Sequence, residues 1–194
     1  MMHNNNNQNK NIRRELLRKS IHLMGLVYIP IYFQTDRITM IIFVFSLTLV
    51  AIFIEILKKK KWVIWILRDY EKKGIGAHLY FCISLLIITI FFSYQACFIG
   101  VICGAAGDGI AGIIRRIWTH GASISMFLTS FILVLILNTK VDIIIPVAFI
   151  SIILATIVEG KIRRIGRYYI NDNFSVPLVA AFTYELFAVL LNFL

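Results

Sequence analysis

The sequence predicts an all-α fold: a polytopic integral membrane bundle of about seven transmembrane helices, with a cytosolic N-terminus. Three observations lead to this prediction. Hydrophobic residues make up 59% of the 194-residue chain and charged residues only 15%, whereas charged residues average about 25% of a soluble domain. Several apolar runs reach roughly the 18 residues that indicate a membrane span. The basic residues also gather in alternate segments between these runs.

Seven apolar runs follow a polar leader. Residues 1–12 are rich in asparagine and are predicted to be disordered, which leaves residues 13–194 as a single transmembrane domain. The first and third runs are short, which fits a tilted or partly in-plane helix as well as a crossing. Short polar turns at 93–95 and 138–141 indicate antiparallel neighbouring helices. The predicted spans are 16–34, 38–57, 79–94, 96–114, 122–138, 142–158 and 174–194.

The alternation of basic residues predicts the orientation. With the N-terminus in the cytosol, 18 of the 20 Lys and Arg residues fall on the cytosolic side, and only Arg37 and Lys140 fall outside. Cytosolic loops of membrane proteins carry such an excess. The net charge of +10 is therefore attributed to topology and anionic membrane lipids rather than to a nucleic-acid polymer. The small size favours a prokaryotic plasma membrane.

The cysteines give no sign of a disulfide framework or a zinc site. Cys82, Cys97 and Cys103 all lie inside apolar runs, without C-x-x-C spacing and without clustered histidines. We expect them to be buried and to pack as small hydrophobic residues.

Ionisable residues in or beside spans are costly and so are functional candidates. Asp108 lies seven residues before Arg115, roughly 10 Å along a helix that runs to the cytosolic side. Glu159 ends the sixth span, and Glu185 alone is expected near mid-membrane. Glu55 is expected to form a surface ion pair beside the lysine run. Asp108 is the strongest candidate, because an unpaired carboxylate at its depth would be expensive.

Two further features lie near these acids. The small residues of 100–112 allow helices to approach closely, and they would equally allow a polyphosphate to approach the backbone. At the start of the last span, Asp172 or Asn173 is suited to be the N-cap and Pro177 to occupy the first turn. Such a helix N-terminus also favours anions. Carboxylates that hold Mg²⁺, together with cations that neutralise phosphates, are the groups needed for phosphoryl transfer.

Three stretches in order carry a family resemblance. Residues 15–23 (ELLRKSIHL) are similar to an E-x-x-R-K-x-x-H start, and residues 107–111 (GDGIA) to a G-D-x-x-A segment. Glu159 and residues 172–178 (DNFSVPL) are similar to a glutamate followed by D-N-x-x-x-P-L. Together they resemble the CTP-dependent lipid kinases, a family that includes dolichol kinase, phytol kinase and yeast-type diacylglycerol kinase. That family is distantly related to phosphatidate cytidylyltransferases, and the resemblance covers residues 13–180.

The resemblance implies a transferase of lipid metabolism and phospholipid biosynthesis. It would move the γ-phosphoryl group of CTP to a lipid alcohol (a polyprenol, phytol or diacylglycerol) at the cytosolic leaflet. Asp108 and Asp172 would act through Mg²⁺, either of them positioning the attacking hydroxyl. His22 would bind phosphate or act as an acid or base. The residues implied in binding the donor or its metal are Arg18, Lys19, Gly107, Arg116, Glu159 and Asn173.

The chain departs from the family pattern after the G-D segment. Arg115 stands where the family usually has a glycine, and residues 118–123 (WTHGAS) lack the Lys and Glu of a K-[ST]-x-E-G-S stretch. Arg115, Arg116 or His120 could replace the lost phosphate contact. Two alternatives therefore stay open. One is a cytidylyltransferase, which attacks the α-phosphorus of CTP. The other is a non-catalytic protein that binds or transports lipid, which the lost residues favour.

Overall fold

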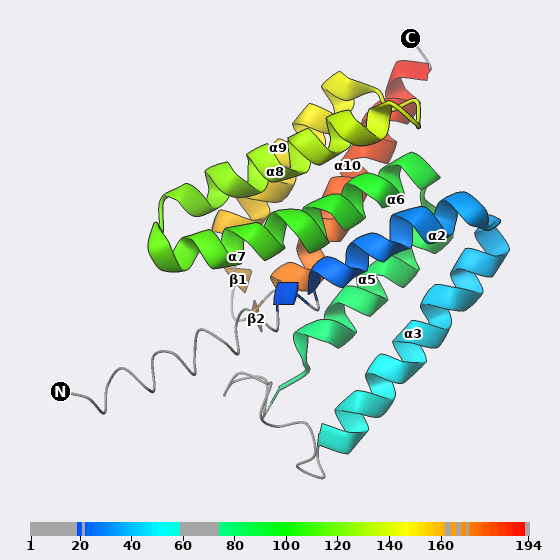
Figure 1. Cartoon of the computed structure of the whole chain (residues 1–194), viewed down its shortest axis with the longest axis vertical. Coiled ribbons are helices and arrows are strands. Elements are labelled where there is room, and N and C mark those ends of the chain that lie inside the picture. The colour runs from blue at the N-terminus through cyan, green and yellow to red at the C-terminus, as the bar shows by residue number, and fades with distance from the viewer. Residues whose placement is uncertain are drawn as a thin grey trace.

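Helices form almost all of the part of the chain that the structure describes (Figure 1). The computed structural model describes residues 19–20, 22–58, 74–161, 164–165, 168–169 and 171–192. Arg18 and the leader 1–12, both named by the sequence predictions, lie outside the described residues. The elements are η1 (a 3₁₀-helix, Met24–Val27), α2 (Tyr28–Gln34), α3 (Arg37–Lys58), α5 (Ala77–Phe91), α6 (Tyr94–Val101), η2 (a π-helix, Ile102–Gly107), α7 (Asp108–Ile117), α8 (Gly121–Asn138), α9 (Ile145–Lys161), β1 (Arg164–Ile165), β2 (Tyr168–Tyr169) and α10 (Asp172–Asn192).

Among the described residues, four helical segments are long and apolar enough to cross a membrane by length and composition. They are α3, the continuous helix Tyr94–Ile117, α8 and α10. The apolar helices Met24–Gln34, Ala77–Phe91 and Ile145–Gly160 are shorter. The 15 residues of α5 extend about 22 Å, which is less than a hydrocarbon core of about 30 Å. Four spans are thus supported where the sequence predicted seven, and the count of seven and the N-terminal orientation stay predictions.

The outer surface of the helices is apolar, as expected for a membrane protein. Only 22% of the most apolar part of α3 is buried, and its exposed side chains include Ile38, Ile42 and Phe53. A helix on the surface of a soluble protein would present polar residues on that side. Apolar exposure along a whole helix fits lipid as the surrounding solvent.

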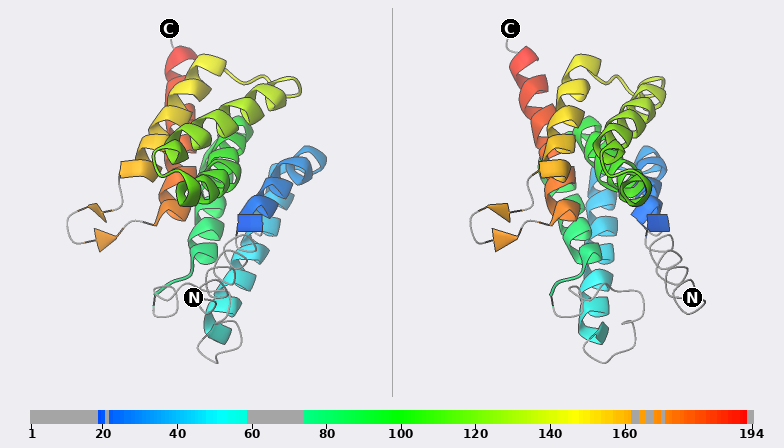
Figure 2. Two further views of the ribbon diagram at one scale, coloured as in Figure 1. Left: turned by 60° about the vertical axis from the view of Figure 1, so that its left-hand side comes forward. Right: turned by 90° about the vertical axis from the view of Figure 1, so that its left-hand side faces the viewer.

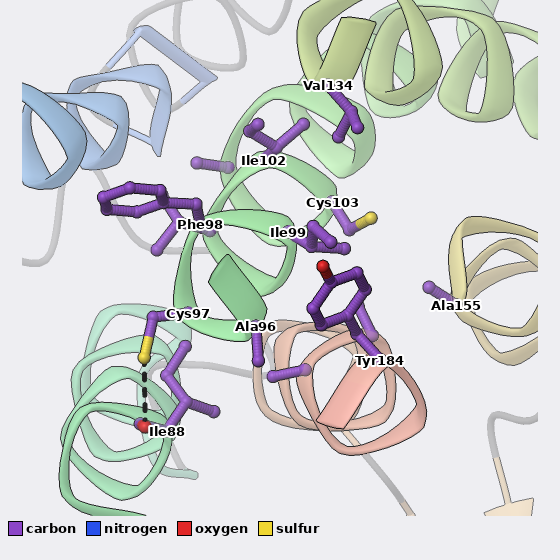
Figure 3. Close-up of a cluster of buried hydrophobic side chains, with 14 of the residues drawn as sticks. Ile88, Ala96, Cys97, Phe98, Ile99, Ile102, Cys103, Val134, Ala155 and Tyr184 are labelled. Carbon is purple, nitrogen blue, oxygen red and sulfur yellow. Dashed lines mark hydrogen bonds between the residues drawn. The ribbon is translucent and has the colours of Figure 1, made fainter. Parts of the chain in front are cut away.

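The helix Tyr94–Ile117, made of α6, η2 and α7, is the centre of the bundle. Of its most apolar part 78% is buried, against α5, α8 and α10. Figure 3 shows the core around it, in which Phe98, Ile99 and Ile102 are almost fully buried. The Cys97 Sγ donates a hydrogen bond to the Ile88 carbonyl at 3.1 Å. Cys97 and Cys103 are buried as predicted, whereas Cys82 is only partly buried.

Glycines let this central helix lie against α10. A Cβ at Gly104 would overlap the ring of Pro177, and one at Gly100 would lie 2.8 Å from the Pro177 carbonyl oxygen. Both contacts belong to the helix–helix interface. Close packing therefore accounts for these two members of the glycine-rich stretch.

The start of α10 differs from the prediction by one residue. Asn171 is the N-cap, because its carbonyl accepts from Phe174 and Ser175 at 3.0 Å and its Oδ1 accepts from the Asn173 N–H at 3.0 Å. The prediction that Asp172 or Asn173 would cap this helix is wrong. The cap position leaves the Asp172 side chain at the first turn of the helix.

Pro177 lies inside α10 and not in its first turn as predicted. Proline has no N–H, so it cannot bond to the carbonyl four residues earlier, which belongs to Asn173. The Ser84 hydroxyl of α5 lies 3.3 Å from that carbonyl oxygen and 2.8 Å from the Phe81 carbonyl oxygen. A neighbouring helix thus supplies a donor where the backbone lacks one.

A short hairpin joins α9 and α10, where the sequence predicted only a loop. Strands β1 and β2 pair antiparallel, with Arg164 opposite Tyr169 and Ile165 opposite Tyr168. Figure 2 shows both strands standing clear of the helices. Aromatic and β-branched residues favour strands, which accounts for this small departure from an all-helical fold.

Candidate functional site

Asp108 is a buried acid of the predicted site and is paired. It begins α7 directly after the π-helix and is 3% exposed. The Lys19 Nζ lies 3.0 Å from its Oδ2 and 3.1 Å from its backbone carbonyl oxygen. The His22 Nε2 lies 3.4 Å from the same Oδ2. The high cost expected for an isolated carboxylate is offset here by a Lys and a His from the N-terminal segment.

His22 connects the N-terminal segment to the π-helix. Its Nε2 donates to the Gly104 carbonyl at 2.6 Å, so this nitrogen carries the proton. Its ring packs on Phe81 with 4.9 Å between ring centroids. π-Helices occur frequently at functional sites, and this one presents a backbone carbonyl to a predicted catalytic residue.

Lys19 is packed into the protein. Its side chain is 7% exposed and lies across Gly112, where an added Cβ would lie 2.5 Å from the Nζ. The resemblance implied that Lys19 clamps phosphate. The geometry instead directs its ammonium group to Asp108, where it can hold the carboxylate in place.

Three carboxylates meet at this point. Asp108, Glu159 at the end of α9 and Asp172 at the start of α10 each offer an oxygen, and these oxygens lie within 4.8 Å of one another. Glu159 is 1% exposed, and its Oε1 forms an ion pair with the Arg115 Nη2. Its Oε2 is buried and has no hydrogen-bond partner among the described residues. We call these three residues the carboxylate cluster.

The carboxylate cluster fits a hard divalent cation. Oxygen ligands from carboxylates are those that Mg²⁺ takes in proteins. A buried carboxylate oxygen without a hydrogen bond is costly, so the Oε2 of Glu159 would gain from a cation. Asp108 and Asp172, implied as metal ligands by the resemblance, are thus brought together, and Glu159 joins them.

The remaining predicted residues have different surroundings. Asn173 is buried, and its Nδ2 donates to the Asp172 Oδ1 at 3.0 Å and so orients that carboxylate. Gly107 packs on α8, where a Cβ would overlap the Ser130 hydroxyl. Arg116 is exposed, and Arg115 contacts the carboxylate cluster. Sequence reasoning had offered Arg115 only as one of three possible phosphate contacts.

Two other acids lie elsewhere. Glu55 accepts from Lys58 at 2.9 Å and from the Gly76 N–H at 2.6 Å. The predicted ion pair is present, but Lys58 is buried, so the pair is not on the surface as predicted. Glu185 accepts from the N–H of Ser93 at 3.0 Å and from its hydroxyl at 2.5 Å, beside the turn between α5 and α6. It therefore lies beside the start of the central helix, whereas its predicted position near mid-membrane stays a prediction.

Comparisons with known proteins identify no relative: no protein-family model, no curated protein and no solved structure matches the chain.

Proposed function

We propose that the chain is a multi-pass membrane enzyme that transfers the γ-phosphoryl group of CTP to a lipid alcohol at the cytosolic leaflet. The observation that carries this proposal is the carboxylate cluster, with Lys19, His22 and Arg115 around it. Acids and cations gathered in an otherwise apolar bundle suit a reaction between a soluble anion and a membrane lipid. The resemblance in residues 15–23, 107–111 and 172–178 supports the same reaction.

Each residue of the site would have a separate role in the reaction. Asp108, Glu159 and Asp172 would hold Mg²⁺, which neutralises charge on the phosphates of the donor. Lys19 and His22 would keep the Asp108 carboxylate fixed in the cluster. Asp172 is less buried than the other two acids and is oriented by Asn173, so it is the better placed to accept the proton of the lipid hydroxyl. In the transfer the hydroxyl oxygen bonds to the γ-phosphorus, and CDP leaves.

The test uses the purified chain in detergent with Mg²⁺, a panel of lipid alcohols and phosphatidate. CTP carries the label on the γ-phosphorus in one reaction and on the α-phosphorus in another. We expect label in lipid from γ-labelled CTP only, and the mobility of the product identifies the acceptor. Label from α-labelled CTP would assign the chain to CDP-lipid synthesis. No transfer from either, or from ATP and GTP, would refute both enzymatic functions and favour a lipid-binding or transport protein.

Asp108→Asn is the variant that should lose the transferase activity. It removes one cluster carboxylate while keeping the size of the side chain, and we expect transfer to stop. Asp142→Asn is the control, because Asp142 is exposed and lies near Glu185 at the other end of the bundle. If Asp108→Asn folds and retains turnover, Asp108 has no part in the reaction.

A further inference from the structure

Three described basic side chains, those of Lys19, His22 and Arg115, contact the carboxylate cluster, and they differ in exposure. The side chains of Lys19 and His22 are 7% and 13% exposed. Both are already engaged: the Lys19 ammonium by two oxygens of Asp108, and the His22 Nε2 by Asp108 and the Gly104 carbonyl. Arg115 is 28% exposed. Of these three it is therefore the one best placed to meet a ligand that arrives from water.

Arg115 also has N–H donors that its contact with Glu159 does not use. Its contact with Glu159 uses one terminal nitrogen, Nη2, whereas a guanidinium carries five N–H donors in a planar fork. That fork matches phosphate oxygens and stays charged at every physiological pH. The buried Glu159 fixes one side of the guanidinium next to the cluster. The rest of the group lies at the edge of the cluster and is partly exposed.

The turn that follows Arg115 and Arg116 contains no lysine. Residues 118–123 contain no Lys, and Trp118, Thr119 and His120 are exposed at the turn between α7 and α8. Trp118 lies against Gly121, where a Cβ would overlap its ring. This turn therefore offers an indole and a histidine where a lysine would be needed to bind phosphate.

We propose that Arg115 binds the triphosphate of the soluble donor nucleotide, with Glu159 holding its guanidinium in position. This inference rests on the proposed function, because it takes a nucleoside triphosphate as the ligand. Loss of a charge-assisted hydrogen bond to phosphate weakens binding by about 10- to 100-fold. The competing explanation is that Arg115 only neutralises the buried carboxylate of Glu159.

A double-mutant cycle separates the two explanations. The probe is a CTP analogue with a methylene bridge between the β- and γ-phosphates, titrated with Mg²⁺ in uncharged detergent. Arg115→Gln is measured with Glu159 and again with Glu159→Gln. If Arg115 binds phosphate, Arg115→Gln weakens analogue binding by about 10- to 100-fold when Glu159 is present. With Glu159→Gln the guanidinium keeps its charge but loses its positioning partner, so Arg115→Gln should still weaken binding, by a smaller factor. Arg115→Lys, which keeps the charge, should recover part of the affinity.

Controls make each outcome decisive. Lys140→Gln removes one exposed charge from the turn between α8 and α9 and should leave analogue binding unchanged. The double variant Arg115→Gln/Glu159→Gln leaves no buried unpaired charge at this position, so it tests the inference even if Arg115→Gln alone does not fold.

Three results would overturn the inference. In the first, Arg115→Gln weakens binding only when Glu159 is present, or not at all. In the second, Arg115→Gln keeps its affinity for the analogue, but added phosphatidate displaces the analogue less well than it does from the unaltered chain. That result would assign Arg115 to a lipid headgroup. In the third, the unaltered chain binds no analogue, which would refute the proposed function as well. The first two results leave the proposed function standing.

Discussion

Replacing Lys19 by Met should destabilise the protein strongly, because it leaves the buried carboxylate of Asp108 without its lysine partner. Asp108 is 3% exposed, and the Lys19 Nζ is 3.0 Å from its carboxylate. Removing one partner of a buried ion pair costs about 3–5 kcal/mol. His22 still contacts the same oxygen, so we expect the lower end, about 3 kcal/mol. For a chain of this size that corresponds to a fall in Tm of about 6 to 12 °C.

The assay follows the buried thiols. Cys97 and Cys103 are buried, so a dye that becomes fluorescent on reaction with thiols reports unfolding of the detergent-solubilised protein as it is heated. Lys140→Met, an exposed substitution, should shift Tm by less than about 2 °C. Lys19→Met/Asp108→Asn removes both charges and should recover most of the loss. The reasoning is refuted if Lys19→Met has the same Tm as Lys140→Met, or if the double variant Lys19→Met/Asp108→Asn has no higher Tm than Lys19→Met.

Two further predictions concern the helix starts. Ser84→Ala should lower the free energy of unfolding by about 0.5–1.5 kcal/mol. The loss should be smaller in a Pro177→Ala background, because the restored N–H of residue 177 can bond to the Asn173 carbonyl. Denaturant titrations measure both losses, and equal losses would contradict this reasoning. At α3, the Thr39 hydroxyl donates to the Asp36 Oδ1 at 2.5 Å and lowers the pKa of that carboxyl. A lowered pKa in the folded state gives stability that is present above the unfolded pKa of about 4 and is lost as pH falls through the folded pKa. Thr39→Val should raise the pKa of Asp36 and move that loss to higher pH, as a carbon-13 NMR titration of the carboxyl would show; an unchanged pKa would rule out the hydroxyl as the cause.

The helices could be predicted from hydropathy because lipid-facing and core-facing residues are both apolar. Thus α3 and α8 begin and end within one residue of the predicted spans 38–57 and 122–138. The start of α10 was misplaced because 171–173 offers three possible caps in a row, and the choice among them depends on packing. The inner position of Pro177 depends on Ser84, which belongs to another helix. A sequence pattern does not contain such a partner.

The acids of the site could be predicted because a buried carboxylate in an apolar run is rare. Their partners could not be predicted in the same way. Lys19 and Asp108 are 89 positions apart, and Arg115 and Glu159 are 44 apart. Only the packing of the N-terminal segment on η2 and α7, and of α9 beside α10, decides which cation meets which acid. The sequence therefore assigned Lys19 to phosphate, whereas the structure pairs it with Asp108.

The π-helix gives the central span a sensitivity to length as well as to composition. Its six residues, Ile102–Gly107, directly precede Asp108. A π-helical turn bonds residue i to residue i+5 and so already holds about one residue more than an α-helical turn. Inserting a further residue would lengthen the span by only about 1.5 Å and leave its hydropathy nearly unchanged, yet it would turn the following helix by about 100°. Asp108 and Arg115 would then face away from Lys19, His22 and Glu159. During evolution substitution in this stretch is restricted as well, because a Cβ at Gly104 or Gly107 would overlap Pro177 or Ser130, and an insertion here would dismantle the carboxylate cluster in a single event.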